Sequence, residues 1–370
     1  MKIAYVSHDS RPNYEYHWFS RMPVEKIKFL DIDFASYPTT KPDNVEYCQV
    51  QSQESRLFAG KYHSTAKLVT YTGFERYLAD VDVIIVLEVF SSIAKQFTEY
   101  AHKHGKKVVV LVYELIPRHP LHYLPSHIGN RLYVIKHADL FVCVSNKARD
   151  CVLALGAPPD KAKVVYPGID LHLFQSVKHS QTNRNLIFVG GLKPHKGIDI
   201  FLEVADAVLP KNPDIKMTVI GKGPYADTIK SYVDKYPQFS YLGPLPNEQL
   251  PSVLQQHGIL VMPCRDMYKY KLKITSEQFG FSFVEAMACG LAVITTDAGA
   301  LPEIVGADNI VVAQNDSKAV IAAVESLLSE PRHLASVQAN NAKRTNKYFD
   351  VRQQARALSE VIEQLGGAHA

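Results

Sequence analysis

The sequence lacks several features that would place it outside ordinary globular proteins. No apolar run reaches the roughly 18 residues of a membrane-spanning helix. The five cysteines are odd in number and none forms a Cys-x-x-Cys pair, which argues against a disulfide framework. The net charge of +4 on 370 residues is too small to favour a nucleic-acid partner. We therefore expect a cytoplasmic protein with reduced, buried thiols that binds no nucleic acid.

Two glycine-rich turns lack the residues that would assign them to common nucleotide sites. The turn VGGLKPHKGIDIF (189–201) is not followed by the Gly-Lys-Ser/Thr of a Walker loop. The turn GKGPYA (221–226) fits the dinucleotide fingerprint formally, but no acidic residue stands near Ser240 or Leu242 to hold a ribose. Nicotinamide binding is therefore disfavoured, whereas close approach of some nucleotide to the backbone at Gly221 stays open.

Short runs rich in Val and Ile alternate with longer stretches of helical periodicity, which is typical of βαβ units and parallel sheets. The predicted strands are 2–7, 81–88, 106–114, 139–145 and 162–168, and then 185–191, 216–223, 258–264, 291–299 and 309–314. We predict an α/β fold with two Rossmann-like, doubly wound parallel-sheet domains. The expected parts are residues 1–174, a polar linker at 175–185, a second domain at 186–345, and a terminal helix within 346–370 that packs on the first domain.

The turn at 189–201 predicts an anion site. A helix that starts near Gly197 would direct its exposed amides and the positive end of its dipole toward a ligand, and Lys196 adds a full charge beside them. Diphosphate is the expected ligand. The alternative is a plain strand-to-helix turn with a solvated lysine.

The stretch SEQFGFSFVEAMACG (276–290) places two glutamates around a glycine. Ser282 and Glu285 fit a Ser-x-x-Glu capping box, and Gly290 stands where a helix C-terminal glycine belongs, so a structural reading accounts for Glu285. That reading does not account for Glu277, which precedes the break at Gly280. Two carboxylates at this spacing could instead accept hydroxyl hydrogen bonds from both ends of a nucleotide sugar.

A series of motifs in the second half resembles a known family. The segments VGGLKPHKG, VIGKGP and EQFGFSFVEAMACGLAVITTDAGALPEIV, in this order, are similar to the nucleotide-sugar-binding domain of retaining glycosyltransferases with the GT-B fold, of the family 4 type. The resemblance is strong over residues 139–315. It implies two domains facing each other across a cleft, a nucleotide-sugar donor, transfer to a hydroxyl acceptor with retention of configuration, and no metal or other cofactor. The pairs Asp31/Asp33 and Asp80/Asp82 are then turn residues rather than metal ligands.

The resemblance also implies roles for particular residues. Glu285 would bind the ribose, Glu277 would contact the hydroxyls of the donor sugar, and Lys196 would neutralise the departing diphosphate. The remaining residues that the resemblance places along the donor are Gly191, Gly221, Arg265, Phe279, Gly280 and Phe281.

The chain departs from the family at two of these places. Gly190-Gly191 stands where the family usually has Gly-Arg, so one cation is missing. Either Lys193 or Arg265 substitutes for it, or the affinity for the donor is lower. In the first domain, Tyr113-Glu114 stands where many relatives have His-Asp. Glu114 is either a catalytic residue that accepts the acceptor's proton or a structural one.

Several alternatives remain open at this level. The segment 11–30 holds the only tryptophan among aromatic and basic residues, which suits peripheral membrane contact, an acceptor groove or a domain core. The acceptor would be a glycan, a lipid-linked molecule or a small molecule, in cell-surface polysaccharide or glycolipid synthesis. The chain could also be a sugar-nucleotide-binding or scaffold protein with impaired catalysis, or another GT-B enzyme such as an epimerase or phosphorylase.

Overall fold

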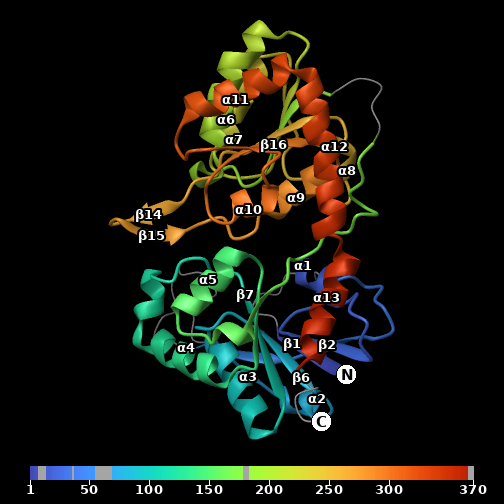
Figure 1. The fold of residues 1–370 in the computed structure, drawn as a ribbon, viewed down its shortest axis with the longest axis vertical. Coiled ribbons are helices and arrows are strands. Elements are labelled where there is room, and N and C mark those ends of the chain that lie inside the picture. Colours follow the sequence, from blue (N-terminus) through green and yellow to red (C-terminus); the bar gives the residue numbers. More distant parts are fainter. Residues whose placement is uncertain (7–13, 36, 55–68, 178–182, 366–370) are drawn as a thin grey trace. The chain divides into compact units, whose positions relative to one another are not determined.

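The computed structural model describes residues 1–6, 14–35, 37–54, 69–177 and 183–365. The chain forms two compact units (Figure 1). Unit 1 contains the residues up to Gly168 and those from Val351 onward, and unit 2 is the continuous segment Ile169–Asp350. Unit 2 is therefore inserted, in sequence, between two parts of unit 1.

The two boundaries between the units in the sequence, after Gly168 and after Asp350, lie a few residues from the predicted bounds at 174 and 345. Ile169 already belongs to unit 2, because its N–H donates to the Phe349 carbonyl (2.8 Å) and it pairs with Asp350. Of the predicted linker, residues 178–182 lie outside the described residues. Its described ends belong to unit 2, where Gln255 donates to the Gln175 carbonyl (2.9 Å) and Gln338 to the Asn183 carbonyl (3.0 Å).

Unit 1 is built on a seven-stranded sheet in which every pairing is parallel, in the order β3-β2-β1-β6-β7-β8-β9. Its strands are β1 Lys2–Val6, β2 Lys26–Asp31, β3 Val45–Gln49, β6 Val83–Leu87, β7 Lys107–Val112, β8 Leu140–Cys143 and β9 Ala162–Val164. The strand order reverses between β1 and β6. Because crossovers are right-handed, the connections on either side of this point cover opposite faces, and the strand ends beside it form the usual ligand position of such sheets.

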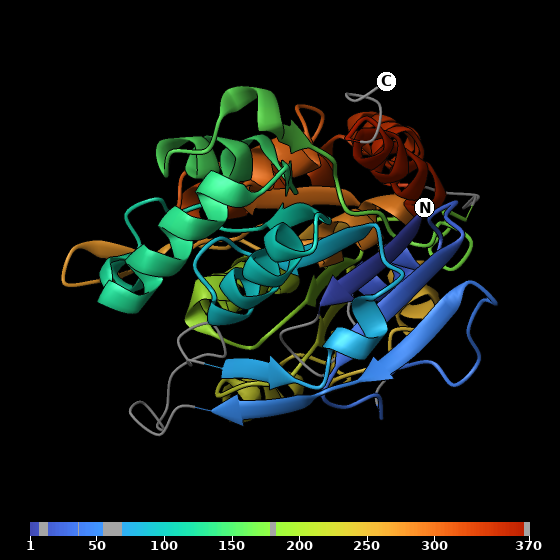
Figure 2. The same cartoon turned by 90° about the horizontal axis from the view of Figure 1, so that it is seen from below.

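The helices of unit 1 cover this sheet, and the strands are almost wholly buried, as expected for a parallel sheet with both faces covered. The helices are α1 Tyr14–Phe19, α2 Glu75–Leu78, α3 Ser92–Lys103, α4 Pro125–His137, α5 Asn146–Ala154 and α13 Val351–Glu363. Helix α13 packs against α1. Two further strands, β4 Gln51–Glu54 and β5 Val69–Thr72, pair antiparallel at the margin of the unit (Figure 2).

Unit 2 repeats the design with a six-stranded parallel sheet in the order β12-β11-β10-β13-β16-β17, which reverses between β10 and β13. The strands are β10 Leu186–Val189, β11 Met217–Ile220, β12 Phe239–Tyr241, β13 Ile259–Val261, β16 Ala292–Thr296 and β17 Ile310–Val312. The helices are α6 Ile198–Val208, α7 Ala226–Lys235, α8 Leu250–Leu254, α9 Phe281–Ala288, α10 Leu301–Val305, α11 Ser317–Ser329 and α12 Pro331–Tyr348. A separate antiparallel hairpin, β14 Met267–Lys269 and β15 Leu272–Thr275, extends from this unit (Figure 1).

The predicted fold class is confirmed: both sheets are parallel and doubly wound. Each of the ten runs predicted as strands contains a strand. In the described part of the aromatic segment 11–30, Trp18 and Phe19 are wholly buried and stack on each other, so these two rings belong to the core. Residues 11–13 lie outside the described residues. No helix in the described part of the chain is long and apolar enough to cross a membrane.

Candidate functional site

A lysine–glutamate pair occupies the end of the unit 2 sheet. Lys196 closes a short 3₁₀ turn, Pro194–Lys196, that follows β10, and Glu277 follows the β14–β15 hairpin. The Lys196 ammonium donates to the Glu277 carboxylate at 2.5 Å. Both side chains are partly exposed, at 25% and 15%. The structure thus brings together two residues that lie 81 positions apart in the sequence and that were both predicted to belong to the site.

Two glycines fix the position of this pair. Gly197 (φ +81°) is the N-cap of α6, and a Cβ there would stand 2.3 Å from the carbonyl oxygen of Pro263. Gly299 (φ +52°) lies against Glu277 in the same way, because its Cβ would stand 2.0 Å from the Glu277 carbonyl oxygen. The Ala300 N–H donates to that carbonyl at 2.9 Å. Side chains at either glycine would displace the backbone that carries Lys196 or Glu277.

The surroundings keep Lys196 charged. Burial lowers the pKa of Lys196, but the Glu277 carboxylate and, to a smaller extent, Cys264 together raise it by more, so the net pKa lies above the ordinary value. The neighbouring His195 has a lowered pKa, first because of burial and then because of Lys196 and Lys193. The local cation near neutral pH is therefore the ammonium, with a neutral imidazole beside it.

Glu285 is not the helix cap that its spacing from Ser282 suggested. Helix α9 begins at Phe281 with Gly280 (φ +79°) as its N-cap, and no side chain caps it. Glu285 consequently lies in the second turn of the helix, where its side chain is only 1% exposed. The capping-box interpretation is wrong because Gly280 adopts a left-handed conformation that starts the helix earlier. The predicted C-terminal glycine is confirmed, since Gly290 (φ +86°) follows the C-cap Cys289.

The aromatic residues around Gly280 anchor the start of α9. Phe279 is buried, with its ring centroid 4.8 Å from that of Phe281 and 5.8 Å from that of Phe349. A Cβ at Gly280 would stand 2.7 Å from the Phe283 ring, so this position also requires glycine. The packed rings of Phe279 and Phe281 thus fix the backbone at the start of α9.

The two glycine-rich turns lie against each other rather than apart. A Cβ at Gly221 (φ +142°) would stand 1.8 Å from the Gly190 carbonyl oxygen, and the Leu192 N–H donates to the Lys222 carbonyl at 3.0 Å. The glycine at 221 is thus required by close approach to protein backbone. At Gly191, by contrast, a Cβ would meet no atom within 4 Å.

Arg265 lies beside the Lys196 turn but already has a partner. Its backbone N–H donates to the His195 carbonyl (2.9 Å). Its guanidinium pairs with Asp199, in the first turn of α6, at 2.5 Å. Its buried Nε has no hydrogen-bond partner among the described residues. Arg265 therefore lies next to the turn that carries Lys196, with part of its charge offset by Asp199.

In unit 1, Glu114 follows β7, as predicted. One carboxylate oxygen accepts the N–H groups of Leu115 (2.9 Å) and Ile116 (2.7 Å), and the other lies 3.5 Å from Nε2 of the buried His122. Burial raises the pKa of Glu114, but His122 and the Ile116 N–H lower it by more, so the carboxyl has a pKa below its ordinary range. The Glu114 carboxylate thus holds the backbone of the turn that follows it, and its negative charge lies next to the His122 imidazole.

Sequence reasoning missed a second carboxyl at this edge. Glu88 follows β6 with a left-handed φ of +62°, and its Oε1 accepts the N–H groups of Tyr113 (2.8 Å) and Glu114 (3.0 Å). Its Oε2 is buried without a hydrogen-bond partner in the described part of the chain. Burial, and then Glu114, raise the pKa of Glu88 to about 8. No local pattern marks Glu88, because its contacts are formed only when β6 and β7 pair.

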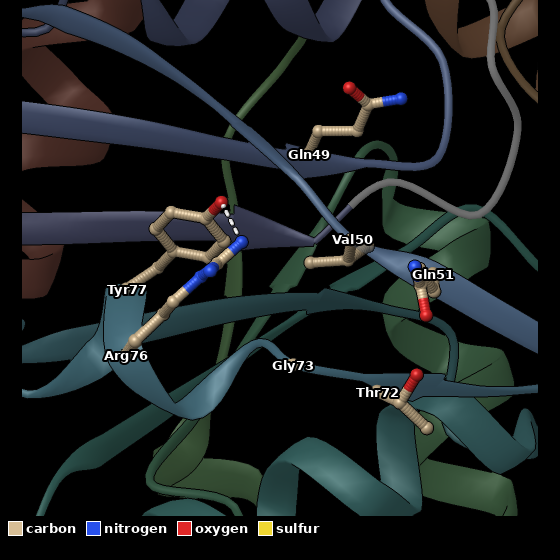
Figure 3. A pocket seen from close by; sticks show the side chains of 7 residues that line it. All are labelled: Gln49, Val50, Gln51, Thr72, Gly73, Arg76 and Tyr77. Carbon is tan, nitrogen blue, oxygen red and sulfur yellow. Dashed lines mark hydrogen bonds between the residues drawn. The ribbon is translucent and has the colours of Figure 1, made fainter.

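A pocket of about 570 Å³ lies elsewhere in unit 1, where β3, β4, β5 and α2 meet (Figure 3). Arg76 donates to the Tyr77 hydroxyl at 2.7 Å on one side of it. No predicted site residue lines this pocket. Its lining is Gln49, Val50, Gln51, Thr72, Gly73, Arg76 and Tyr77.

Two doubly wound parallel-sheet units, one of which carries a glycine-rich turn and a lysine–glutamate pair at the end of its sheet, have the architecture of the GT-B fold. The family described as glycosyl transferases group 1 matches residues 172–345, and glycosyltransferase family 4 matches residues 34–173. The chain therefore belongs to the group 1 glycosyltransferases.

Individual relatives agree with this assignment. The chain is 28% identical over 261 residues to the lipopolysaccharide core biosynthesis mannosyltransferase LpsB of Rhizobium meliloti, covering 65% of this chain and 69% of the relative. It is 26% identical over 215 residues to the GDP-mannose-dependent alpha-(1-6)-phosphatidylinositol monomannoside mannosyltransferase of Mycolicibacterium smegmatis, covering 54% of this chain and 56% of that relative. The chain thus spans only a little more than half the length of the Mycolicibacterium protein.

Among solved structures, Anabaena Alr3699/HepE in complex with UDP is similar over 98% of this chain and 100% of its own, with a TM-score of 0.75 and 16% identity. The same protein has also been solved with UDP-glucose, with a TM-score of 0.71 and 16% identity. At this level of identity the likeness establishes the fold alone.

Proposed function

We propose that this protein transfers a sugar from a nucleoside-diphosphate sugar to a hydroxyl acceptor, with retention of configuration and without a metal ion. The observation that carries the proposal is the Lys196–Glu277 pair, which two close glycine contacts hold at the sheet end of unit 2. A charged ammonium at this place suits a diphosphate that gains negative charge as the glycosidic bond breaks. Glu277, its partner, is placed to accept hydrogen bonds from the sugar hydroxyls.

The remaining donor contacts follow from the same geometry. The start of α6 and the start of α9 both supply backbone amides, which favour phosphate oxygens. We assign the ribose to Glu285, as the resemblance implies, because this carboxylate lies in the second turn of α9, the helix that begins just after Glu277. Gly191, Gly221 and Arg265 complete the surroundings of the diphosphate in this proposal.

The acceptor side is proposed to lie in unit 1, where Glu114 would accept the proton of the attacking hydroxyl. A lipid-linked or glycan acceptor is favoured by the relatives, of which one is named for a phosphatidylinositol monomannoside and another for the lipopolysaccharide core. We place the reaction in the cytoplasm, in the synthesis of cell-surface glycan or glycolipid.

Calorimetry with UDP, GDP, ADP and dTDP, in the absence of metal, tests the donor site. We expect one nucleotide to bind, and Lys196→Ala to weaken it by about 10- to 100-fold, the cost of a charged hydrogen bond. Glu285→Ala should weaken the same nucleotide. Lys230→Ala is the control, because that exposed lysine on α7 pairs with Asp227 on the same helix. Binding that ignored the substitutions at Lys196 and Glu285 would contradict the proposal.

One observation favours a second candidate, a sugar-nucleotide-binding protein with impaired catalysis. Gly191 supplies no side chain to the diphosphate and Arg265 is engaged by Asp199, so unit 2 offers fewer free cations than the resemblance implies. The two candidates differ in turnover. A transferase consumes the donor and, by NMR of the product, retains the anomeric configuration, whereas a binding protein leaves the donor intact with every acceptor supplied.

A further inference from the structure

The β14–β15 hairpin exposes an unusual set of side chains. Tyr268, Tyr270 and Leu272 are exposed by 60%, 88% and 50%, and Met267 is also exposed. Together with Lys269 and Lys271, these residues form six consecutive positions, 267–272, which we call the hairpin tip. Figure 1 shows the hairpin extending from unit 2, away from its sheet. Four large apolar or aromatic side chains thus face solvent on one short projection.

The backbone of the turn makes this exposure more informative. Tyr270 (φ +50°) and Lys271 (φ +64°) both adopt the left-handed conformation at the centre of the turn. Two-residue hairpin turns of this kind are normally made by Asn-Gly or Asp-Gly, which adopt positive φ more easily. The chain therefore carries a tyrosine and a lysine at positions where the fold alone would favour other residues.

The hairpin tip is also positively charged. Residues 267–275 contain three lysines and no carboxylate. Lys273 pairs with Asp266 at the base of the hairpin, and no ion pair joins Lys269 or Lys271 to a carboxylate in the part of the chain that the structure describes. The charge at the tip is thus uncompensated, and the Lys269 ammonium lies 5.6 Å from the centre of the Tyr270 ring.

The base of the hairpin is held firmly. Asp266 accepts from Ser276 at 2.5 Å as well as from Lys273, and its N–H donates to Gln314 at 2.7 Å. These contacts join both ends of the hairpin to the loop after β17. A fixed base and an exposed tip are suited to insertion into an extended surface.

We propose that the hairpin tip docks on an anionic lipid surface. Tyr270 and Leu272 would enter the boundary between headgroups and acyl chains, where tyrosine is favoured, and Lys269 and Lys271 would contact lipid phosphates. A soluble polyanion would account for the lysines, but it would give no reason for exposing tyrosines and a leucine beside them. The proposal goes beyond the transferase activity, because docking requires only this hairpin.

Co-sedimentation with vesicles tests the proposal on the full chain. The protein is expected to bind phosphatidylglycerol vesicles and to bind phosphatidylcholine vesicles far more weakly. Lys269→Gln/Lys271→Gln should reduce binding to phosphatidylglycerol by about 30-fold. Tyr270→Ser/Leu272→Ser should reduce it by about 10-fold, since the apolar contact is lost. The matched controls are Lys230→Gln and Val233→Ser on α7, which remove one exposed lysine and one exposed apolar side chain.

Every outcome bears on the proposal. Failure of the wild type to bind phosphatidylglycerol vesicles, or equal loss in the α7 controls, overturns it. If dextran sulfate competes fully and only the lysine variant weakens binding, the hairpin tip recognises a soluble polyanion and lipid docking is wrong. Nucleotide binding, measured by calorimetry on the same variants, should be unchanged, so failure of the docking proposal is distinguishable from failure of the proposed donor site.

Discussion

At the scale of single residues, the two carboxyls at the β6 and β7 ends of unit 1 have opposite electrostatic character. Glu114 lies next to His122 and has a lowered pKa, so its carboxylate stays charged. Glu88, which accepts a hydrogen bond from the Glu114 N–H, is buried, and its pKa is raised to about 8. One environment thus separates the protonation of two adjacent acids, as sites that transfer protons often do. Glu88 also holds the backbone of Tyr113 and Glu114 in place.

The raised pKa of Glu88 makes stability depend on pH. The unfolded state loses the Glu88 proton near pH 4.5 and the folded state near 8, so between these values the free energy of unfolding falls as pH rises. Glu88→Gln keeps a neutral side chain in both states and removes this effect. We expect the free energy of unfolding of the variant, relative to that of the wild type, to increase by on the order of 1 kcal/mol per pH unit from pH 5 to 8. Urea unfolding measures both values. The exposed Glu75→Gln is the control, and a pH-independent difference would show that Glu88 is ionised when folded.

At the scale of helices and strands, the sequence predicted elements whose apolar runs are continuous and missed those whose pattern is broken. Strand β2 was missed because Lys28 interrupts it. That lysine is nearly buried and donates to Asp80 (2.6 Å) and to the Tyr77 carbonyl (2.9 Å). The hairpin at 267–275 was missed because its aromatic residues and lysines face solvent on both sides. It therefore lacks the alternation of buried and exposed residues by which a strand is predicted from sequence.

Site residues followed a similar rule. The turn at Lys196 and the break at Gly280 were predictable because glycine and helix signals are local. The register of α9, and hence the position of Glu285 within it, depends on the φ of Gly280 and on the packing of Phe283, neither of which a spacing pattern contains. The close contact between Gly221 and Gly190 was likewise invisible, because it joins two strand ends.

Two glycines offer a direct test of these element-level contacts. Gly221→Ala is expected to lower the free energy of unfolding by about 3 kcal/mol or more, since its Cβ would overlap the Gly190 carbonyl and its φ is strained for alanine. Gly129→Ala, in the middle of α4 with no atom within 4 Å of the new Cβ, should instead raise it by about 0.5–1 kcal/mol. Chemical denaturation of both variants checks the opposite signs. Equal effects would mean that the turn at 221 relaxes freely.

At the scale of the whole molecule, the donor site proposed above lies entirely in unit 2, and the only tryptophan, Trp18, lies in the core of unit 1. Each unit can therefore be followed separately during unfolding. Circular dichroism reports both units, whereas tryptophan fluorescence reports unit 1.

We expect the bound nucleotide to stabilise unit 2 selectively. At 100 times its dissociation constant a ligand adds about 2.7 kcal/mol, which for a unit of this size raises the melting temperature by about 5–10 °C. The part of the circular dichroism change that arises from unit 2 should move to higher temperature by this amount, while the fluorescence transition of unit 1 stays in place. A fluorescence transition that moved equally would show that the two units unfold as a single cooperative block.

The return of the chain to unit 1 at Val351 has a consequence for synthesis on the ribosome. Helix α13, which packs on α1, is translated only after all of unit 2. Unit 2 is contiguous and can fold as soon as it has emerged, whereas the apolar surface that α13 covers in unit 1 stays exposed until then. The half of the protein that is translated first is thus the half that matures last, and chaperones that bind nascent chains would be expected to recognise it.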